Sequence, residues 1–93
     1  MNREFIARRV IYHGRVQGVG FRVSMAHIAR KFAVEGFVRN LADGTVELLA
    51  QGPADEVQRF LAAIATQFQA NLTRTEEVIV TQDATATGFT IRE

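Results

Sequence analysis

The nine residues from Gly14 to Arg22, GRVQGVGFR, separate two segments whose apolar residues repeat with different periods. Before them, Arg8 to His13 alternates in the manner of a β-strand, and after them, Phe21 to Ala33 repeats in the manner of an amphipathic helix. The chain must therefore pass from a strand into a helix through a turn that contains three glycines. This strand, loop and helix unit restricts the possible folds more than any other part of the sequence.

The loop has the properties of an anion-binding site. Gly14, Gly18 and Gly20 can adopt positive φ at little cost, which lets successive amide hydrogens point toward one place at a helix N-terminus. Arg22 opposes the helix dipole there by about 0.3–1 kcal/mol. A hydrogen bond to a charged group contributes about 1.5–3 kcal/mol, so a bound dianion explains this arginine. The alternative is a loop that only reverses the chain.

Two segments make the sequence recognisable. GRVQGVGFR and the later GFVRNLADGTVE, from Gly36 to Glu47, closely resemble the two signature blocks of the acylphosphatase family. The resemblance continues through Gly52-Pro53, returns at Gly88 to Arg92 and covers most of the chain. It implies an enzyme that hydrolyses acyl phosphates, which are carboxylic–phosphoric mixed anhydrides, to a carboxylate and inorganic phosphate. The implied mechanism is direct attack by a positioned water, without a cofactor or a metal.

The resemblance also implies roles for individual residues. The family's arginine, which binds the phosphoryl oxygens, falls on Arg22, and its asparagine, which holds the attacking water, falls on Asn40. The amides expected to complete the phosphate site are those of Arg15, Val16, Gln17, Gly18, Val19 and Gly20. Asn40 could instead prepare the turn that follows it, and His13 could act as a base, although a structural hydrogen bond is the simpler expectation for this histidine.

Composition restricts the remaining function classes. Ninety-three residues with 47% apolar content predict one domain over residues 1–93, and a net charge of +1 does not favour nucleic-acid binding. The absence of cysteine excludes thiol nucleophiles and thiolate metal sites within this chain, and no histidine or carboxylate cluster suggests another metal. The start, Met1 to Glu4, precedes a strand without a signal-length apolar run. We therefore expect a cytoplasmic monomer that acts on a small-molecule acyl phosphate, away from membranes.

The pattern along the chain predicts an α+β fold of the ferredoxin-like split βαβ type, βαββαβ with a short final strand. Two helices would pack on one face of an antiparallel sheet. In the first half of the chain we expect a central strand Phe5–His13, a helix Phe21–Ala33 and a strand Val34–Leu41 that carries Phe37 and Leu41 on one face. A turn Ala42–Thr45 and a strand from Val46 to a break at Gly52-Pro53 follow, and then a helix that buries Val57, Phe60, Leu61, Ile64 and Phe68. The chain should end with a loop Gln69–Thr75, a strand Val78–Thr81, a turn Asp83–Thr87 and a strand Phe89–Arg92.

This topology has a consequence for the site. A strand–helix–strand crossover makes its two strands parallel, so Asn40 should lie at the same end of the sheet as the glycine loop. The sequence departs from the family at Ser24, where an aromatic residue is usual, and at residues 67–74, which lack the usual Gly-Pro-Pro-like turn. Two rival functions are a non-catalytic phosphate-binding module and an RNA-binding sandwich. The second is disfavoured because Val46 to Ala50 contains no aromatic residue.

Overall fold

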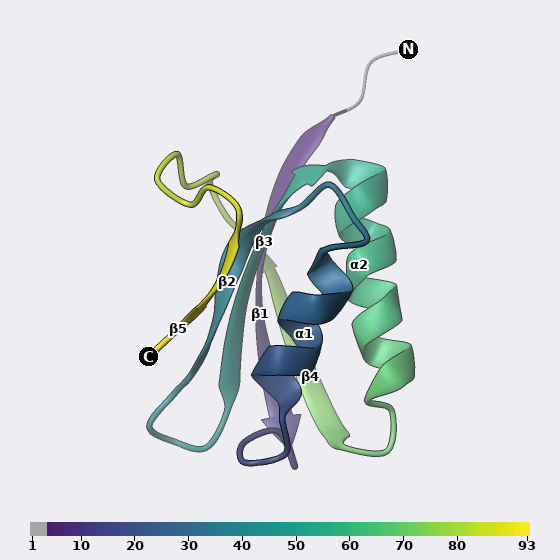
Figure 1. The fold of residues 1–93 in the computed structure, drawn as a ribbon, viewed down its shortest axis with the longest axis vertical. Helices are drawn as coiled ribbons and strands as arrows, with labels where there is room; N and C mark the ends of the chain where they lie inside the picture. The colour runs from purple at the N-terminus through teal and green to yellow at the C-terminus, as the bar shows by residue number, and fades with distance from the viewer. Residues whose placement is uncertain (1–3) are drawn as a thin grey trace.

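The structure, a computed structural model, describes residues 4–93; Met1 to Arg3, where the predicted approach to the first strand begins, lie outside them. Five strands form one sheet in the order β4-β1-β3-β2-β5 (Figure 1). Two helices cover one face of this sheet, as predicted. The elements are β1 (Phe5–Gly14), α1 (Phe21–Ala29), β2 (Glu35–Asn40), β3 (Val46–Pro53), α2 (Ala54–Gln67), β4 (Leu72–Ile79) and β5 (Phe89–Arg92).

The pairing of the strands confirms the ferredoxin-like arrangement and extends it. The pairs β1–β3, β1–β4 and β2–β3 are antiparallel, whereas β5 pairs in parallel with β2. The sheet is therefore mixed, because the final short strand adds a parallel edge to the predicted antiparallel sheet. β1 lies between β3 and β4, which confirms its prediction as a central strand.

The core lies between the sheet and the two helices. Phe21 and Met25 of α1 and Phe60 of α2 are fully buried, and the Phe21 ring packs edge-on against Tyr12 at 5.4 Å and Phe68 at 4.5 Å between ring centroids. On β2 it is Val38 that enters this core, fully buried, so Phe37 projects from the opposite face. A buried residue at the start of α1 fixes where the helix begins and therefore where the glycine loop must end.

Two predicted boundaries differ from the structure for local reasons. α1 ends at Ala29 instead of Ala33, because the amides of Arg30, Lys31 and Phe32 bond to carbonyls three residues back and tighten the last turn. β3 continues through Gly52-Pro53 instead of breaking there, since both residues remain in register with β1. α2 begins directly afterwards at Ala54, where Pro53 occupies the N-cap position.

The predicted loop Gln69–Thr75 is wrong in its second half. β4 begins at Leu72 and ends at Ile79, so only two residues of the predicted strand Val78–Thr81 belong to it. β4 is an edge strand whose residues after Thr73 all remain exposed on both faces. Because these side chains are exposed, apolar and polar residues do not alternate in the sequence of β4, and the strand is defined by its pairing with β1.

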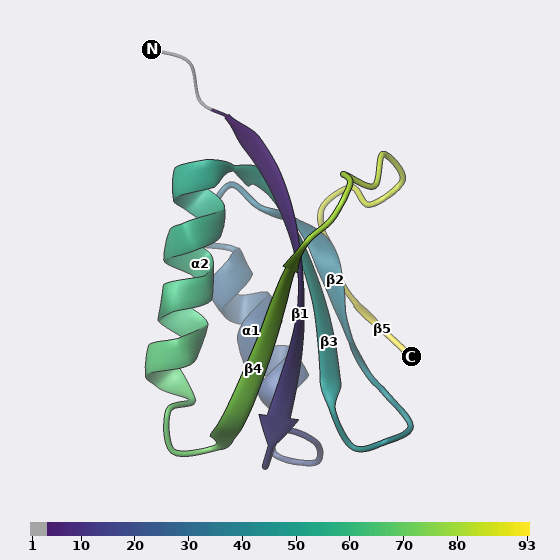
Figure 2. The ribbon, with the colours of Figure 1, turned by 180° about the vertical axis from the view of Figure 1, so that it is seen from behind.

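The segment after β4 crosses the helix-free face of the sheet to reach β5 (Figure 2). Gln51 of β3 holds it there: its Nε2 donates to the carbonyl of Asp83 at 2.8 Å and of Ala86 at 3.3 Å, and its Oε1 accepts from the Asp83 amide at 2.9 Å. The segment buries Ala86 and returns the chain to the sheet beside β2. This connection fixes the position of β5, whose end enters the candidate site.

Candidate active site

The ends of two strands bring the predicted site together. Tyr12 of β1 and Asn40 of β2 both pair with Val46 of β3, one from each side. The glycine loop that follows β1 and the end of β2, which carries Asn40, therefore lie at the same end of the sheet, as the crossover argument predicted (Figure 1). Asn40 also lies two residues after the buried Val38, so it projects toward the face that carries α1.

The loop has the backbone conformation that an anion site requires. Gly18 and Gly20 both have φ of 76°, in the left-handed region, and Gly20 is the N-cap of α1 without a side-chain capping bond. A Cβ at either glycine would meet nothing within 4 Å, so the conformation and not crowding explains them. The N-terminus of α1 is thus open to a ligand.

The loop amides divide into two groups. The Arg15 amide donates to the Asn71 carbonyl at 2.9 Å and the Val16 amide to the Gly14 carbonyl at 3.0 Å, and the side chain of Val16 is buried in the core. Within the described residues, the amides from Gln17 to Gly20 have no protein acceptor. The donors available to a phosphate in this loop are therefore these four amides.

Gln17 ties the loop to the β2–β3 hairpin. Its Nε2 donates to the Leu41 carbonyl at 2.8 Å and to the Thr45 carbonyl at 2.9 Å. Leu41 follows Asn40 directly, so this double hydrogen bond fixes the distance between the amides of the loop and the Asn40 side chain. The Gln17 side chain therefore shapes the loop.

Replacing Gln17 with methionine should loosen this connection. The variant removes the donor from two carbonyls of the hairpin, so we expect the free energy of unfolding to fall by about 1–3 kcal/mol. The KM for an acyl phosphate should rise several-fold, because the loop and Asn40 then move independently. Urea denaturation and steady-state kinetics measure the two effects. Gln58→Met, on the exposed face of α2, is the matched control; equal effects in both variants would contradict the role of Gln17.

Arg22 lies in the first turn of α1 and reaches the last strand. Its Nη1 donates to the Arg92 carbonyl at 3.2 Å. Among the described residues no carboxylate lies within ion-pair distance of its guanidinium. Arg92 is itself anchored on the other face of the sheet, where its guanidinium lies 3.9 Å from the centroid of the Phe37 ring. One hydrogen bond thus positions Arg22 while its remaining N–H groups stay available.

Asn40 carries the most unusual polar atom of the site. Its Oδ1 is buried and has no hydrogen-bond partner within the part of the chain that the structure describes. The turn does not depend on this side chain, because the Asp43 carboxylate accepts from the amide and hydroxyl of Thr45, at 3.0 and 2.5 Å. These hydrogen bonds hold the pKa of Asp43 below its ordinary value. A buried, unpaired acceptor costs stability, so it needs an explanation beyond the fold.

The helix-free face of the sheet carries two groups of paired side chains, Glu47 with Arg9 and Arg39, and His13 with Glu76. Burial by itself would raise the pKa of Glu47, but hydrogen bonds from Arg9 and Arg39 outweigh it and leave that pKa below its ordinary value. The Arg9 Nε lies 2.5 Å from Glu47, and Arg39 bonds the second carboxylate oxygen. His13 contacts Glu76 at 2.5 Å, which confirms the structural hydrogen bond predicted for it. Its contact thus lies on β4, away from Arg22.

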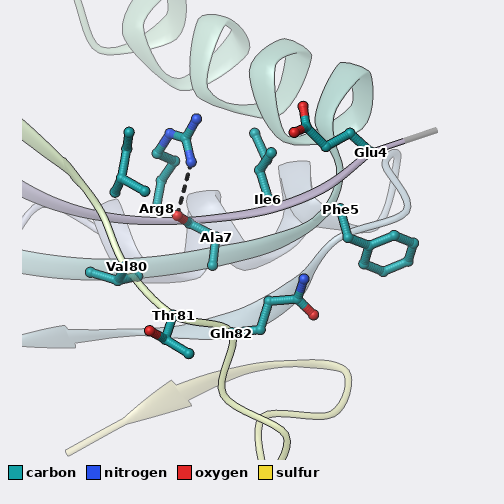
Figure 3. A pocket seen from close by; sticks show the side chains of 9 residues that line it. Glu4, Phe5, Ile6, Ala7, Arg8, Val80, Thr81 and Gln82 are labelled. Carbon is teal, nitrogen blue, oxygen red and sulfur yellow. Dashed lines mark hydrogen bonds between the residues drawn. The ribbon is translucent and has the colours of Figure 1, made fainter.

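Two depressions of the surface lie away from these residues. One, of about 400 Å³, is lined by Glu4 to Arg8 and by Ile79 to Gln82 (Figure 3). Its lining comes from the start of β1 and the end of β4, which lie at the opposite end of the sheet from the glycine loop. Neither depression is lined by Arg22, Asn40 or the glycine loop. None of the helices within residues 4–93 is long and apolar enough to cross a membrane.

Two contacts of the site could not be predicted from the sequence. Arg22 meets Arg92 across 70 positions, and Gln17 meets Leu41 and Thr45 across 24 and 28. No local pattern marks such pairs, because they depend on the tertiary positions of β5 and the hairpin. The position of Gln17 inside the glycine loop indicated its place near the site but not its hydrogen-bond acceptors.

Comparison with known proteins identifies the arrangement. The Acylphosphatase family model matches residues 8–91. An acylphosphatase from Rhizorhabdus wittichii is 41% identical over 85 residues, covering 91% of this chain and 86% of the relative. An acylphosphatase from Azorhizobium caulinodans is 39% identical over 83 residues, covering 88% and 89%. The crystal structure of acylphosphatase from Bacillus subtilis superposes with a TM-score of 0.83 at 32% identity, covering 97% of this chain and all of that one.

Proposed function

Because this chain belongs to the acylphosphatase family and hydrolyses acyl phosphates, we propose that Arg22 and the amides of Gln17 to Gly20 bind the phosphoryl group while Asn40 holds the attacking water. The observation that carries this proposal is the buried Oδ1 of Asn40, which has no hydrogen-bond donor among the described residues, on a residue that shares the helix-covered face of β2 with Val38. A water that donates to this oxygen would satisfy it and would be held beside the phosphoryl site.

The positive charge of the site suits the phosphoryl end of the substrate. A guanidinium and a row of amides match the geometry of phosphoryl oxygens and stabilise the negative charge that these oxygens carry in the transition state. Arg22 keeps one N–H on the Arg92 carbonyl and offers the others to the ligand. Arg15, exposed at the start of the loop, adds a second positive charge at the rim of the site. The amides of Arg15 and Val16 stabilise the loop through their hydrogen bonds to the carbonyls of Asn71 and Gly14.

The reaction needs little acid or base assistance. The water oxygen forms a bond to phosphorus, the bond between phosphorus and the acyl oxygen breaks, and the electron pair leaves on a carboxylate. A carboxylic acid has a pKa of about 4, so its carboxylate leaves without a proton donor. The proton lost by the water passes to the phosphate product or to solvent. Positioning and charge stabilisation then account for the rate, as in other phosphoryl transfers.

The finer parts of the function are proposals of the same kind. We propose that the reaction needs no metal ion, because Arg22 and the amides supply the positive charge that a cation provides in other phosphoryl-transfer sites. One core cluster runs through both helices and the sheet, which supports a single domain over residues 1–93. A monomeric cytoplasmic enzyme acting on a small-molecule acyl phosphate is the corresponding proposal for its assembly and location.

A phosphate-release assay tests the proposal. The purified protein should hydrolyse acetyl phosphate at the same rate before and after exhaustive treatment with a chelator, and inorganic phosphate should inhibit competitively. A rate that falls with the chelator and returns with added magnesium would contradict the metal-free site. Phosphate binding without turnover of either acetyl phosphate or benzoyl phosphate would indicate a binding module instead.

A further inference from the structure

The end of β5 meets an aromatic ring on the helix-free face of the sheet. The guanidinium of Arg92, the last residue of β5, lies 3.9 Å from the centroid of the Phe37 ring of β2. β5 is an edge strand of four residues that pairs with β2 alone (Figure 1). A short strand that is paired on one side only depends more on such a side-chain contact than a central strand does.

The register of the two strands brings these side chains together. Phe37 pairs with Thr90, and Arg92 lies two residues further along β5, so Phe37 and Arg92 are diagonal neighbours on one face of the sheet. Diagonal neighbours reach each other when one side chain is aromatic and the other is long. A guanidinium within about 6 Å of a ring centroid is attracted to the negative face of the ring. The distance in this structure is well inside that limit.

The ring is the closest partner of the Arg92 guanidinium. Within the described chain, Arg92 belongs to none of the ion pairs. Hydrogen bonds from Thr85 hold the pKa of Asp83 below its ordinary value, and the positive charge of Arg92 adds to this effect. Because no described carboxylate is within ion-pair distance, the Phe37 ring is the contact that holds the guanidinium in place.

The main-chain carbonyl of the same residue belongs to the candidate site. It accepts the hydrogen bond from Nη1 of Arg22 at 3.2 Å. Among the described residues, this is the one hydrogen bond of the Arg22 side chain. Arg92 therefore connects the Phe37 ring on one face of the sheet to the guanidinium of Arg22 at the start of α1. A functional group held by a single hydrogen bond is only as well placed as its acceptor.

We propose that Phe37 is a positioning residue of the active site: its ring holds the side chain of Arg92, and the Arg92 carbonyl then orients Arg22 toward the phosphoryl group. This inference rests on the proposed function, because it needs the proposed role of Arg22. Phe37 lies on the opposite face of β2 from the buried Val38, so the ring acts on Arg22 from outside the site. The alternative is a stack that stabilises an edge strand and leaves the reaction unchanged.

Phe37→Leu tests this role, because it removes the ring and keeps an apolar side chain. The kcat/KM for acetyl phosphate should fall about 10-fold, and the dissociation constant of inorganic phosphate should rise by a similar factor, the scale of losing an outer support of a functional group. Arg92→Met keeps the carbonyl and removes the guanidinium, so it should reproduce both effects. Phe37→Trp keeps an aromatic face and should stay within about twofold of the wild type.

Arg9→Met is the matched control on the helix-free face. Arg9 is a partly exposed arginine that pairs with Glu47 and makes no contact with the Phe37 ring. The variant should lose stability, because it leaves Glu47 with one partner fewer, and should keep the wild-type kcat/KM and phosphate affinity. Urea denaturation of each variant separates a loss of stability from a loss of function.

Double variants test the route of the effect. Phe37 belongs to the strand that also carries Asn40, so its loss could act along β2 instead of through β5. If the effect passes through Arg92 to Arg22, Phe37→Leu should lower kcat/KM about 10-fold in the Asn40→Ala enzyme and less than twofold in the Arg22→Ala enzyme, where no guanidinium remains to be positioned.

Three results would overturn the proposal. Phe37→Leu could keep the wild-type kcat/KM and phosphate affinity, Arg92→Met could do so, or Phe37→Leu could cost the same 10-fold in the Arg22→Ala enzyme. The proposed function fails by a different result, which is wild-type activity in Arg22→Ala alone. An essential Arg22 with an unaffected Phe37→Leu thus refutes the positioning role and leaves the proposed function intact.

Discussion

Arg22→Ala should lower kcat/KM for acetyl phosphate by at least about 10³-fold, the scale of losing a main electrostatic group of a phosphoryl-transfer site. The structure gives the reason. Arg22 is held by one hydrogen bond to the Arg92 carbonyl and has no carboxylate partner in the described chain, so its charge is available to a dianion. The free energy of unfolding should change by less than about 1 kcal/mol, because a partly exposed arginine with one neutral hydrogen bond contributes little.

Two further variants make this prediction specific. Arg22→Lys keeps the charge but loses the planar fork, so it should recover only a small part of the lost activity. Arg30→Ala removes an exposed arginine from the other end of the same helix and should behave as the wild type. Steady-state kinetics with all three variants measure the effect. Activity in Arg22→Ala within tenfold of the wild-type value would show that another group carries the phosphoryl charge.

Asn40→Ala should lower kcat about 10²–10³-fold and leave the affinity for inorganic phosphate unchanged, because a positioning group contributes to the reaction without contacting the phosphate. The stability of the Asn40→Ala variant distinguishes a functional residue from a structural one. Oδ1 of Asn40 is buried without a partner, so removing it should leave the free energy of unfolding equal or raise it by about 1 kcal/mol. A residue whose loss harms the rate but not the fold is typical of a functional site.

Asn71→Ala is the matched control for Asn40. Its Nδ2 donates to the Arg15 carbonyl at 3.0 Å, so it is also an amide side chain at this end of the sheet. We expect Asn71→Ala to lose about 1 kcal/mol of stability and to keep kcat within a few-fold, the reverse of the Asn40 result. If Asn40→Ala instead unfolded more easily and kept its rate, Asn40 would be a turn residue, which was the alternative reading of its position.

Most of the fold could be predicted because burial leaves patterns in the sequence. The stripe of Phe21, Met25 and Ile28 indicated α1, and the change of period at Gly14 located the loop. β4 could not be recognised in full, since Thr73 to Glu77 face solvent on an edge strand and are held only by pairing with β1. The parallel pairing of β5 was equally hidden, because four residues contain too little pattern to specify a partner.

The candidate site also has features that the sequence predicts and features that it does not. Arg22 and Asn40 could be placed at one end of the sheet because a strand–helix–strand crossover makes its two strands parallel. Which loop amides remain available could not be predicted, because the Arg15 amide donates to the carbonyl of Asn71, which is 56 residues away and lies in the turn before β4. The contact of Arg22 with the Arg92 carbonyl was hidden for the same reason.

A titration with inorganic phosphate, followed at the backbone amides by NMR, tests the separate roles of Arg22 and Asn40 most directly. The titration compares the wild type, Arg22→Ala and Asn40→Ala. The account predicts that Gln17 to Gly20 shift in the wild type and in Asn40→Ala with the same dissociation constant, and that Arg22→Ala loses most of its affinity. Equal weakening in both variants, or binding that shifts amides far from this loop, would contradict it.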